Sequence, residues 1–267
     1  MHLCSLYRFP LKSGSAELLE EGRCDELGLS GDRRWMVVDA ATGKFLTQRA
    51  LPQMALLHAR WQGEKALRLS AFGMDDLLVP TPDSTSVARG VLVWRESLQV
   101  PDAGDAAAAW LTRLLERPCR LVYLPTSQGI QVDLDYAHPG ERTAFSDGFP
   151  FLLIGQASLD DLSARVGRLF DMRRFRPNLV ISGAAPYAED GWRRIRIGGI
   201  EFRVVKPCSR CVIPTIDPLD AERSPDREPL ATLMNYRKGE GGVFFGQNLI
   251  AEGIGELKVG MPVEVLE

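Results

Sequence analysis

The sequence predicts a mainly β protein with a few added helices, of the α+β class, in which short strands form β-barrels. Three observations lead to this prediction. Short apolar runs of strand length recur along the chain, separated by Gly, Pro and Asp clusters. Helical periodicity is confined to a few segments. The strands and helices do not alternate as they do in a parallel α/β sheet, and the chain has no internal repeat.

The clearest strand signals are pairs of apolar runs around turn residues. RIRIGGIEFRVV alternates apolar and charged residues on both sides of Gly198-Gly199, and this glycine pair can supply the positive φ of a two-residue hairpin turn. RWMVVD (34–39) and KFLTQR (44–49) predict a second hairpin, and the C-terminal ELKVGMPVEVLE predicts a further pair of strands. Other strands are expected in LRLSA, DLLVP, GVLVW and CRLVYLP.

Three segments favour helices. Residues 105–117 place several large apolar side chains on one side of a helix. QASLDDLSARVGRLF has Leu and Val at helical spacing, with Ser158 as the expected N-cap. Pro229 is expected to begin a third helix, because proline is favoured in the first turn. The polar stretch 124–147 is the expected boundary, which gives two domains, residues 1–123 and 124–267.

Charge and composition indicate where the protein works. The net charge of −3 gives no basic field that would attract nucleic acid or an anionic membrane. The longest strongly apolar run, FPFLLIG, is far shorter than the roughly 20 residues of a spanning helix. The N-terminus lacks a secretory signal, and the five cysteines are mostly scattered, which is typical of a reducing compartment. We therefore expect a cytoplasmic protein without a nucleic-acid or membrane partner.

The segment KPCSRCVIPT carries two cysteines, Cys208 and Cys211, whose purpose the spacing leaves open. Structural zinc would need two further ligands, whereas His2, His58 and His138 are isolated in sequence. A thioredoxin-like dithiol would precede a helix, but two prolines follow the pair closely and disfavour one.

Two other interpretations of this pair remain. Free cysteines are often small buried hydrophobic residues. However, Lys206 and Arg210 flank the pair, and cationic neighbours lower a thiol pKa, which suits a loop at a site better than a core. A single thiolate could also bind a soft metal that a cofactor carries. Composition and periodicity do not decide between these interpretations.

Several segments together resemble a known family. KPCSRCVIPTIDP, EPLATLMNYR, FFGQNLI and GELKVGMPVEVL resemble the molybdenum cofactor sulfurase C-terminal (MOSC) domain. LYRFPLKS, GLSGDRRWMVVD and FLTQR resemble the β-barrel domain that precedes it, and AFSDGFPFLLIGQASLDDL, FRPNLVISG and PYAEDGW match between them. The resemblance covers essentially the whole chain. It is closest to the mitochondrial amidoxime reducing components and their bacterial relatives, and it implies a MOSC β-barrel domain packed against an N-terminal β-barrel-like domain.

The resemblance also implies a cofactor and its ligands. The family binds molybdenum–molybdopterin, and the second cysteine of its motif, here Cys211, is the metal ligand, so Cys208 is a neighbour. Lys12, Ser13 and Arg33 correspond to positions that contact the cofactor's phosphate, where charge-assisted hydrogen bonds are strong.

Further matched positions complete the expected site. Arg176 and Asn178 match positions near the pterin and the metal, and Ser209 belongs to the same cofactor-binding set. Asp147 matches a carboxylate near the metal and is the expected proton donor. Gly148, Phe149 and Asn248 differ in type from the residues of relatives, so the pocket lining and the substrate are expected to differ.

The implied activity is the reduction of N-hydroxylated compounds such as hydroxylamines, amidoximes and N-hydroxylated bases. No electron-relay motif is visible, so the electrons are expected from a separate iron–sulfur or flavin protein. The segments of this chain show no iron–sulfur cysteine cluster and no anchor-like apolar run, so we expect neither an iron–sulfur domain nor a membrane anchor. The alternative is a carrier of the cofactor, or of sulfur for it, without turnover of its own.

Overall fold

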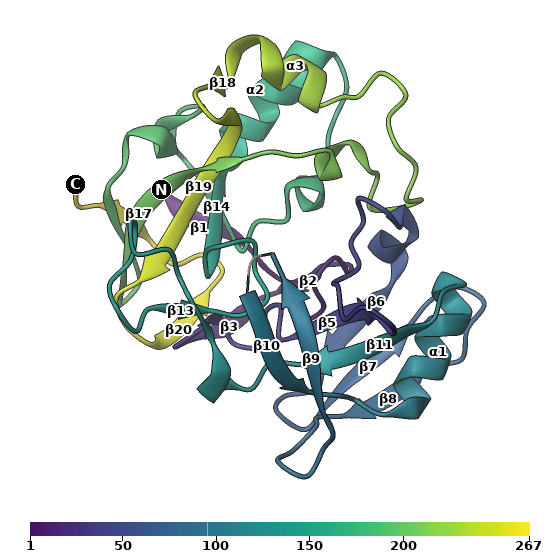
Figure 1. Cartoon of the computed structure of the whole chain (residues 1–267). Coiled ribbons are helices and arrows are strands. Elements are labelled where there is room, and N and C mark those ends of the chain that lie inside the picture. The colour runs from purple at the N-terminus through teal and green to yellow at the C-terminus, as the bar shows by residue number, and fades with distance from the viewer. Residues whose placement is uncertain (95) are drawn as a thin grey trace.

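The computed structural model describes residues 1–94 and 96–267. A large sheet with α2 and α3 forms one part of the molecule, together with a small sheet of residues 21–29 and 255–258, and other small sheets with α1 form the second part (Figure 1). The two chain ends lie near each other on the large-sheet side, where the Val263 amide donates to the Met1 carbonyl over 3.1 Å.

Within the described residues, the large sheet has nine strands in the order β2-β1-β15-β14-β19-β17-β16-β21, with β18 paired beside β19. Pairing is antiparallel except between β14 and β15, which are parallel. In sequence order the strands are β1 (His2–Arg8), β2 (Glu17–Leu19), β14 (Phe151–Gly155), β15 (Leu179–Ser182), β16 (Arg194–Ile197), β17 (Ile200–Ser209), β18 (Lys238–Gly239), β19 (Gly242–Ala251) and β21 (Val263–Val265).

The smaller sheets pair as β20-β3-β4, β6-β7-β8, β9-β10, β5-β11 and β12-β13. Their bounds are β3 (Glu21–Asp25), β4 (Gly28–Leu29), β5 (Trp35–Asp39), β6 (His58–Trp61), β7 (Ala66–Ser70), β8 (Leu77–Pro80), β9 (Ala88–Val93), β10 (Glu96–Pro101), β11 (Cys119–Tyr123), β12 (Ile130–Gln131), β13 (Arg142–Thr143) and β20 (Gly255–Lys258).

The helices are short. The α-helices are α1 (Asp105–Leu115), α2 (Gln156–Val166) and α3 (Leu230–Tyr236), and the 3₁₀ turns are η1 (Pro52–Leu56), η2 (Thr126–Gln128), η3 (Met172–Phe175), η4 (Ala188–Gly191) and η5 (Ile213–Thr215). No helix in the described part of the chain combines the length and apolar character needed to cross a membrane.

The three expected helices are present, but the expected cap of α2 is wrong. This helix begins after Gly155, so Ser158 lies inside it, where its hydroxyl donates to the buried carboxylate of Glu189 at 2.7 Å. The helix ends at Gly167, whose φ of +80° stops it. Leu169 therefore lies beyond the helix and is exposed.

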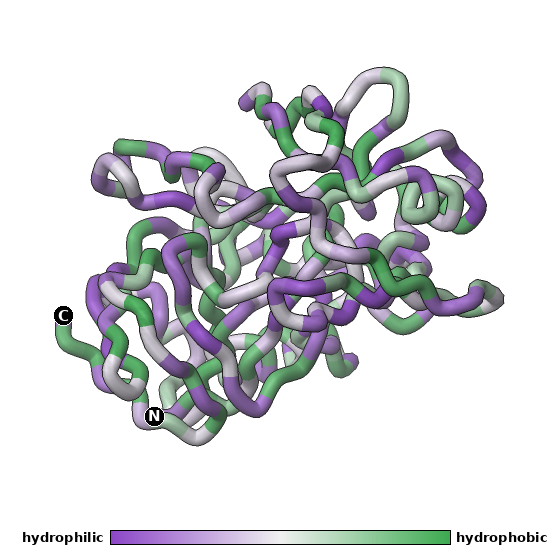
Figure 2. The backbone as a smooth tube through the Cα atoms, turned by 90° about the horizontal axis from the view of Figure 1, so that it is seen from below, coloured by the Kyte–Doolittle hydropathy of each residue, from purple (hydrophilic) through white to green (hydrophobic). Residues whose placement is uncertain are grey.

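β14 joins two cores because its apolar run is buried on both faces. Phe151 and Leu153 pack into the cluster that contains Leu3 of β1, while Ile154 packs on the opposite face against Leu159 of α2. Short hydrophobic and hydrophilic stretches follow one another along the whole chain (Figure 2). A third core, around Trp35 and the apolar face of α1, lies in the part with the smaller sheets.

The structure extends one expected pairing and changes another. The hairpin expected between residues 34–39 and 44–49 forms over a short stretch, where Val38 bridges Phe45 and the Leu46 amide donates to the Val37 carbonyl over 2.8 Å, before the chain turns at Thr47. β5 also pairs along its length with β11, which was not expected. The C-terminal strands form, but β20 pairs with β3 and β21 pairs with β16. The glycine hairpin between β16 and β17 is confirmed, with Ile197 opposite Ile200.

The predicted mainly β, α+β class is confirmed, whereas a closed barrel is not formed by continuous strand pairing. Within the described residues, the large sheet has two ends, β2 and β21. The start of β1 nevertheless meets the loop before β21, since the Leu3 amide donates to the Met261 carbonyl over 3.0 Å. The two edges of the sheet are thus close at this point without a full ladder.

Candidate functional site

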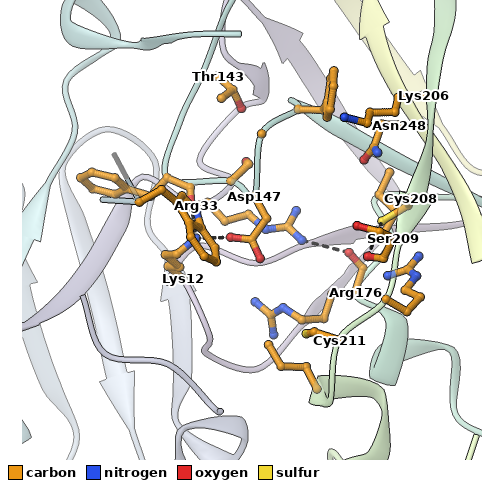
Figure 3. Close-up of a pocket in the computed structure, with 18 of the residues that line it drawn as sticks. Lys12, Arg33, Thr143, Asp147, Arg176, Lys206, Cys208, Ser209, Cys211 and Asn248 are labelled. Carbon is orange, nitrogen blue, oxygen red and sulfur yellow. Dashed lines mark hydrogen bonds and ion pairs between the residues drawn. The ribbon is translucent and has the colours of Figure 1, made fainter. Parts of the chain in front are cut away.

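A cavity of about 790 Å³ lies between the two parts of the molecule and receives residues from both. Figure 3 shows Lys12 and Arg33 on one side of it and Lys206, Cys208 and Ser209 of β17 on the other. The site residues expected from the sequence all line this cavity: Lys12, Ser13, Arg33, Asp147, Arg176, Asn178, Ser209 and Cys211.

Cys211 lies in the loop that follows β17, and Arg210 fixes that loop. The Arg210 amide donates to the Val243 carbonyl over 2.7 Å. Its guanidinium donates to the Phe245 carbonyl from Nε at 2.8 Å and to the Phe175 carbonyl at 2.9 Å. These bonds tie the loop to β19 and to η3, and they leave Cys211 on the cavity wall.

The two cysteines have different surroundings. Both cysteines are partly buried and line the cavity, but Cys208 also packs against the core between β14 and α2, and burial raises the pKa of its thiol. Cys211 is partly exposed on the cavity. In the described part of the chain, no group of three or more His, Cys, Asp or Glu residues could hold a metal. A metal at Cys211 would therefore have to bring other ligands with it, which disfavours structural zinc.

Lys12 lies just beyond β1 and is held in a buried position. Its amide donates to the Trp35 carbonyl over 2.8 Å, and its ammonium donates to the Phe145 carbonyl over 2.7 Å. The ammonium also forms an ion pair with Asp147. Burial lowers the pKa of Lys12 in spite of this carboxylate.

Asp147, the residue expected to donate a proton, is held in an ion pair with Lys12. Burial would raise the pKa of its carboxyl group, but the charges of Lys12, Arg49 and Arg33 outweigh burial and lower this pKa. The carboxylate is therefore ionised at neutral pH, whereas a proton donor needs a pKa nearer neutrality.

Arg33 is fixed by several acceptors. Its Nη1 donates to Asp32 Oδ2 at 2.6 Å and to Asn178 Oδ1 at 3.1 Å, and its Nη2 donates to the Arg176 carbonyl at 2.9 Å. The buried Asn178 amide also donates to the Tyr7 carbonyl at 3.2 Å. Asn178 thus acts in this structure as a positioning residue for Arg33.

Arg176 is the least compensated buried cation of the site. Its Nη1 donates to the Gly14 carbonyl at 2.6 Å, and its guanidinium lies 4.2 Å from the centre of the Phe9 ring. Among the described residues, no carboxylate lies within ion-pair distance of it. Burial, together with the charge of Arg33, lowers the pKa of Arg176 to about 9. An anion beside Arg176 would offset the free-energy cost of burying this cation.

Backbone strain is concentrated around the cavity. Eight non-glycine residues of the described chain have positive φ, and four of them line the cavity: Ser13, Arg33, Trp94 and Arg176. Such residues cost energy and persist where the surrounding structure fixes them, which is common at binding sites. The cations are thus held in place by strained turns.

The cavity is positive although the chain is negative. Among described residues, its wall carries seven cationic side chains and three carboxylates. The cations are Lys12, Arg33, Arg49, Arg174, Arg176, Lys206 and Arg210. The net charge of the whole chain is −3. A concave surface lined by one sign of charge concentrates its field, so this site favours an anionic ligand.

Some lining residues were missed by reasoning from the sequence. Thr143 is buried, and its hydroxyl has no hydrogen-bond partner among the described residues. Arg49, Trp94 and Lys206 also line the cavity. No motif signals Thr143 or Arg49, whereas an exposed tryptophan such as Trp94 is unusual enough to suggest a contact surface.

Comparison with known proteins identifies the family. Residues 1–118 match the MOSC N-terminal beta barrel domain, and residues 140–264 match the MOSC domain. Mitochondrial amidoxime-reducing component 1 of Homo sapiens is 36% identical over 283 aligned residues, which cover 99% of this chain and 82% of the relative. This chain belongs to the MOSC-domain family. The resemblance predicted from the sequence motifs is thus confirmed.

Other members of the MOSC-domain family give the same result. Mitochondrial amidoxime-reducing component 1 of Mus musculus is 34% identical, with 99% of this chain and 82% of the relative covered. Mitochondrial amidoxime reducing component 2 of Bos taurus is 34% identical, with 97% and 81% covered. The segments that form the cavity, from Lys12 to Asn248, therefore lie inside the aligned region of nearly the full chain.

Proposed function

We propose that this chain binds a molybdenum–molybdopterin cofactor in the cavity and reduces N-hydroxylated compounds. One observation carries the proposal: Cys211 lines the same cavity as the buried Lys12 and the partly buried Arg33 and Arg176. A soft thiolate for a metal and positive groups for a phosphate are the two things that such a cofactor requires. The names of the relatives support the reaction class.

The residues present fit this cofactor. Cys211 would ligate the metal, and Lys12, Ser13, Arg33 and Arg176 would hold the anionic phosphate. Ser209 lies beside Cys211 at the end of β17, and the unpartnered hydroxyl of Thr143 offers a further hydrogen bond. Asn178 would act through Arg33. The cofactor, when bound, supplies two-electron redox chemistry, while the protein positions the reactants.

The proposed reaction breaks an N–O bond. A hydroxylamine or amidoxime takes up two electrons and two protons, and it leaves as the amine or amidine and one water. The electrons would come from a separate electron-transfer protein, iron–sulfur or flavin. Asp147 would hold the Lys12 ammonium in place through their ion pair. The lowered pKa of the Asp147 carboxyl group makes this role a better fit than proton donation.

The proposal also concerns the two sequence domains, residues 1–123 and 124–267. The first would supply the phosphate-binding residues Lys12 and Arg33, and the second would supply Cys211 and Arg176. The cofactor would then be held between them.

The test compares two cysteine variants that differ by three positions. Cys211→Ala and Cys208→Ala are produced with the wild type in a host that makes the cofactor, and molybdenum is measured per chain. We expect Cys211→Ala to lose most of its molybdenum, and to lose more than about 100-fold in the reduction of benzamidoxime by reduced viologen. Cys208→Ala should retain its molybdenum and its activity, since Cys208 lines the cavity but packs its side chain against the core.

Two outcomes would contradict the proposal. Equal molybdenum in Cys211→Ala and the wild type would remove Cys211 as the ligand. Stoichiometric molybdenum in a wild-type protein that reduces no hydroxylamine or amidoxime would instead indicate the carrier function.

A further inference from the structure

An arginine and a tryptophan lie together on the wall of the cavity. The Arg49 guanidinium lies 5.1 Å from the centre of the Trp94 ring. The Trp94 ring also contacts Phe45, with ring centres 5.0 Å apart. Both Arg49 and Trp94 line the cavity. An arginine stacked on an indole is held in one orientation and keeps its N–H groups available in the plane of the guanidinium.

Exposure separates this pair from the deeper cations. The side chains of Lys12 and Arg33 are 6% and 12% exposed, whereas that of Arg49 is 31% exposed and Trp94 is 49% exposed. The deep cations belong to the site proposed for the cofactor phosphate. Arg49 and Trp94 are therefore more open to solvent than the deep cations, and the Lys12 ammonium lies 5.7 Å from the centre of the Trp94 ring, so they border the site proposed for the cofactor.

The Arg49 guanidinium has hydrogen-bond donors that no acceptor of the described chain uses. Its Nη2 lies 3.8 Å from Asp147 Oδ2, which is a long ion pair, and within the described residues its guanidinium donates no hydrogen bond. The Asp147 carboxylate is already bound by Lys12. A guanidinium with free N–H groups binds a carboxylate or phosphate in a bidentate way.

Trp94 is held in place at a cost. Its φ of +55° is unfavourable for a bulky residue, and it directly follows β9. Nearly half of its surface is nevertheless open, whereas a tryptophan that only fills a core would be buried. A strained, exposed aromatic ring on a cavity wall is suited to stack on a planar ligand.

We propose that Arg49 and Trp94 form a substrate subsite that selects planar N-hydroxylated compounds carrying an anionic group, such as a carboxylate or phosphate. Trp94 stacks on the planar part, and Arg49 pairs with the anion. This inference rests on the proposed function and names the substrate class of the same site.

The experiment uses benzamidoxime and 4-carboxybenzamidoxime, two planar compounds that differ by one charge. Dissociation constants are measured by calorimetry on the full chain from a cofactor-producing host, without reductant, and KM and kcat are measured with reduced viologen. We expect the wild type to bind the carboxylated compound about tenfold more tightly. Arg49→Gln should remove this preference through KM, with kcat within about twofold.

The ring contact is tested in parallel. Trp94→Leu should weaken binding of both compounds by about tenfold, because stacking does not depend on the charge. Matched controls are Arg68→Gln and Phe72→Ala, exposed residues of the same types that do not line the cavity. Both controls should bind the two compounds as the wild type does.

Three results would overturn the inference. The first is an equal affinity of the wild type for both compounds. The second is a preference for the carboxylated compound that survives in Arg49→Gln. The third is loss of molybdenum in Arg49→Gln, which would assign Arg49 to the cofactor. Failure of the proposed function is distinct. A wild type that reduces neither compound, but that binds the carboxylated one in an Arg49-dependent way, would refute the reduction and support the subsite.

Discussion

Arg176 indicates its ligand through the contacts that it lacks. The side chain is partly buried against Phe9 and donates one hydrogen bond to Gly14, yet no carboxylate of the described chain pairs with it. A buried charge without a partner costs free energy of folding, so it is retained where function uses it. At the residue scale, this argues for a bound anion more directly than the number of cations around the cavity does.

The first prediction concerns this cation and its pH dependence. Inorganic phosphate should raise the melting temperature of the cofactor-free wild type at pH 7 by about 2–4 °C, because it binds the folded chain only. Since the pKa of Arg176 is lowered to about 9, the cation is present below pH 9 and lost above it. The phosphate effect should therefore fade as the pH rises through 9.

Arg176→Met is the matching variant. Without the cation, the phosphate effect should fall by at least half at pH 7 and should lose its dependence on pH near 9. In the absence of phosphate, the variant should be at least as stable as the wild type at pH 7, because burying the cation costs stability, in full below the lowered pKa and less and less as the pH rises to the unfolded-state pKa. A phosphate effect equal to that of the wild type would show that Arg176 does not face the anion site.

Strand β19 controls the position of the cysteine loop. Gly246 in this strand has a φ of +78°, and a Cβ there would lie 2.6 Å from Ile154 Cγ1 and 2.7 Å from the Leu153 carbonyl oxygen. The same Cβ would lie 3.3 Å from Nη2 of Arg210, the residue that anchors the loop of Cys211. At the element scale, one glycine thus permits both the packing of β14 on β19 and the anchoring of the loop.

A second prediction tests this glycine. Gly246→Ala should destabilise the chain by about 3 kcal/mol, since the positive φ and the overlap with β14 both add cost. Chemical denaturation measures the change. Gly253→Ala is the control, because a Cβ at Gly253 meets no atom within 4 Å. A loss below about 1 kcal/mol in Gly246→Ala would show that β14 and Arg210 adapt without cost.

The whole molecule is joined by its first strand. β1 lies between β2 and β15 in the large sheet, and Leu3 and Leu6 are fully buried in the same cluster as Phe151 and Phe202. β3 likewise pairs with β20 from the other end of the chain. The core of the large sheet therefore depends on residues nearly 200 positions away in sequence.

A third prediction follows at this scale. The isolated fragment 124–267 should lack a cooperative melting transition, because removal of β1 exposes the fully buried Leu179 and Leu249 of the large sheet. Near-ultraviolet circular dichroism measures the loss of packing, and the full chain is the control. A sharp melting transition of the fragment would contradict the expectation and would show that its core closes without β1.

The sequence indicated those features that depend on local chemistry. Gly198 is followed by a second glycine between alternating strands, so the β16–β17 hairpin could be predicted. The cap of α2 could not, because Ser158 is satisfied by Glu189, which lies 31 positions further along the chain. The pairing of β5 with β11 was missed for the same reason: strand partners distant in sequence leave no local pattern.

By itself, the sequence determined the α+β class, the family motifs and the residues expected around Cys211. Only the tertiary structure showed that these residues share one positive cavity, that Asp147 is paired with Lys12, and that Trp94 and Arg49 contact each other on the cavity wall. The physical reason is that hydrophobic patterning and turn residues act over a few positions. In contrast, charge pairing, burial and cavity shape depend on segments that meet only after the sheets have packed.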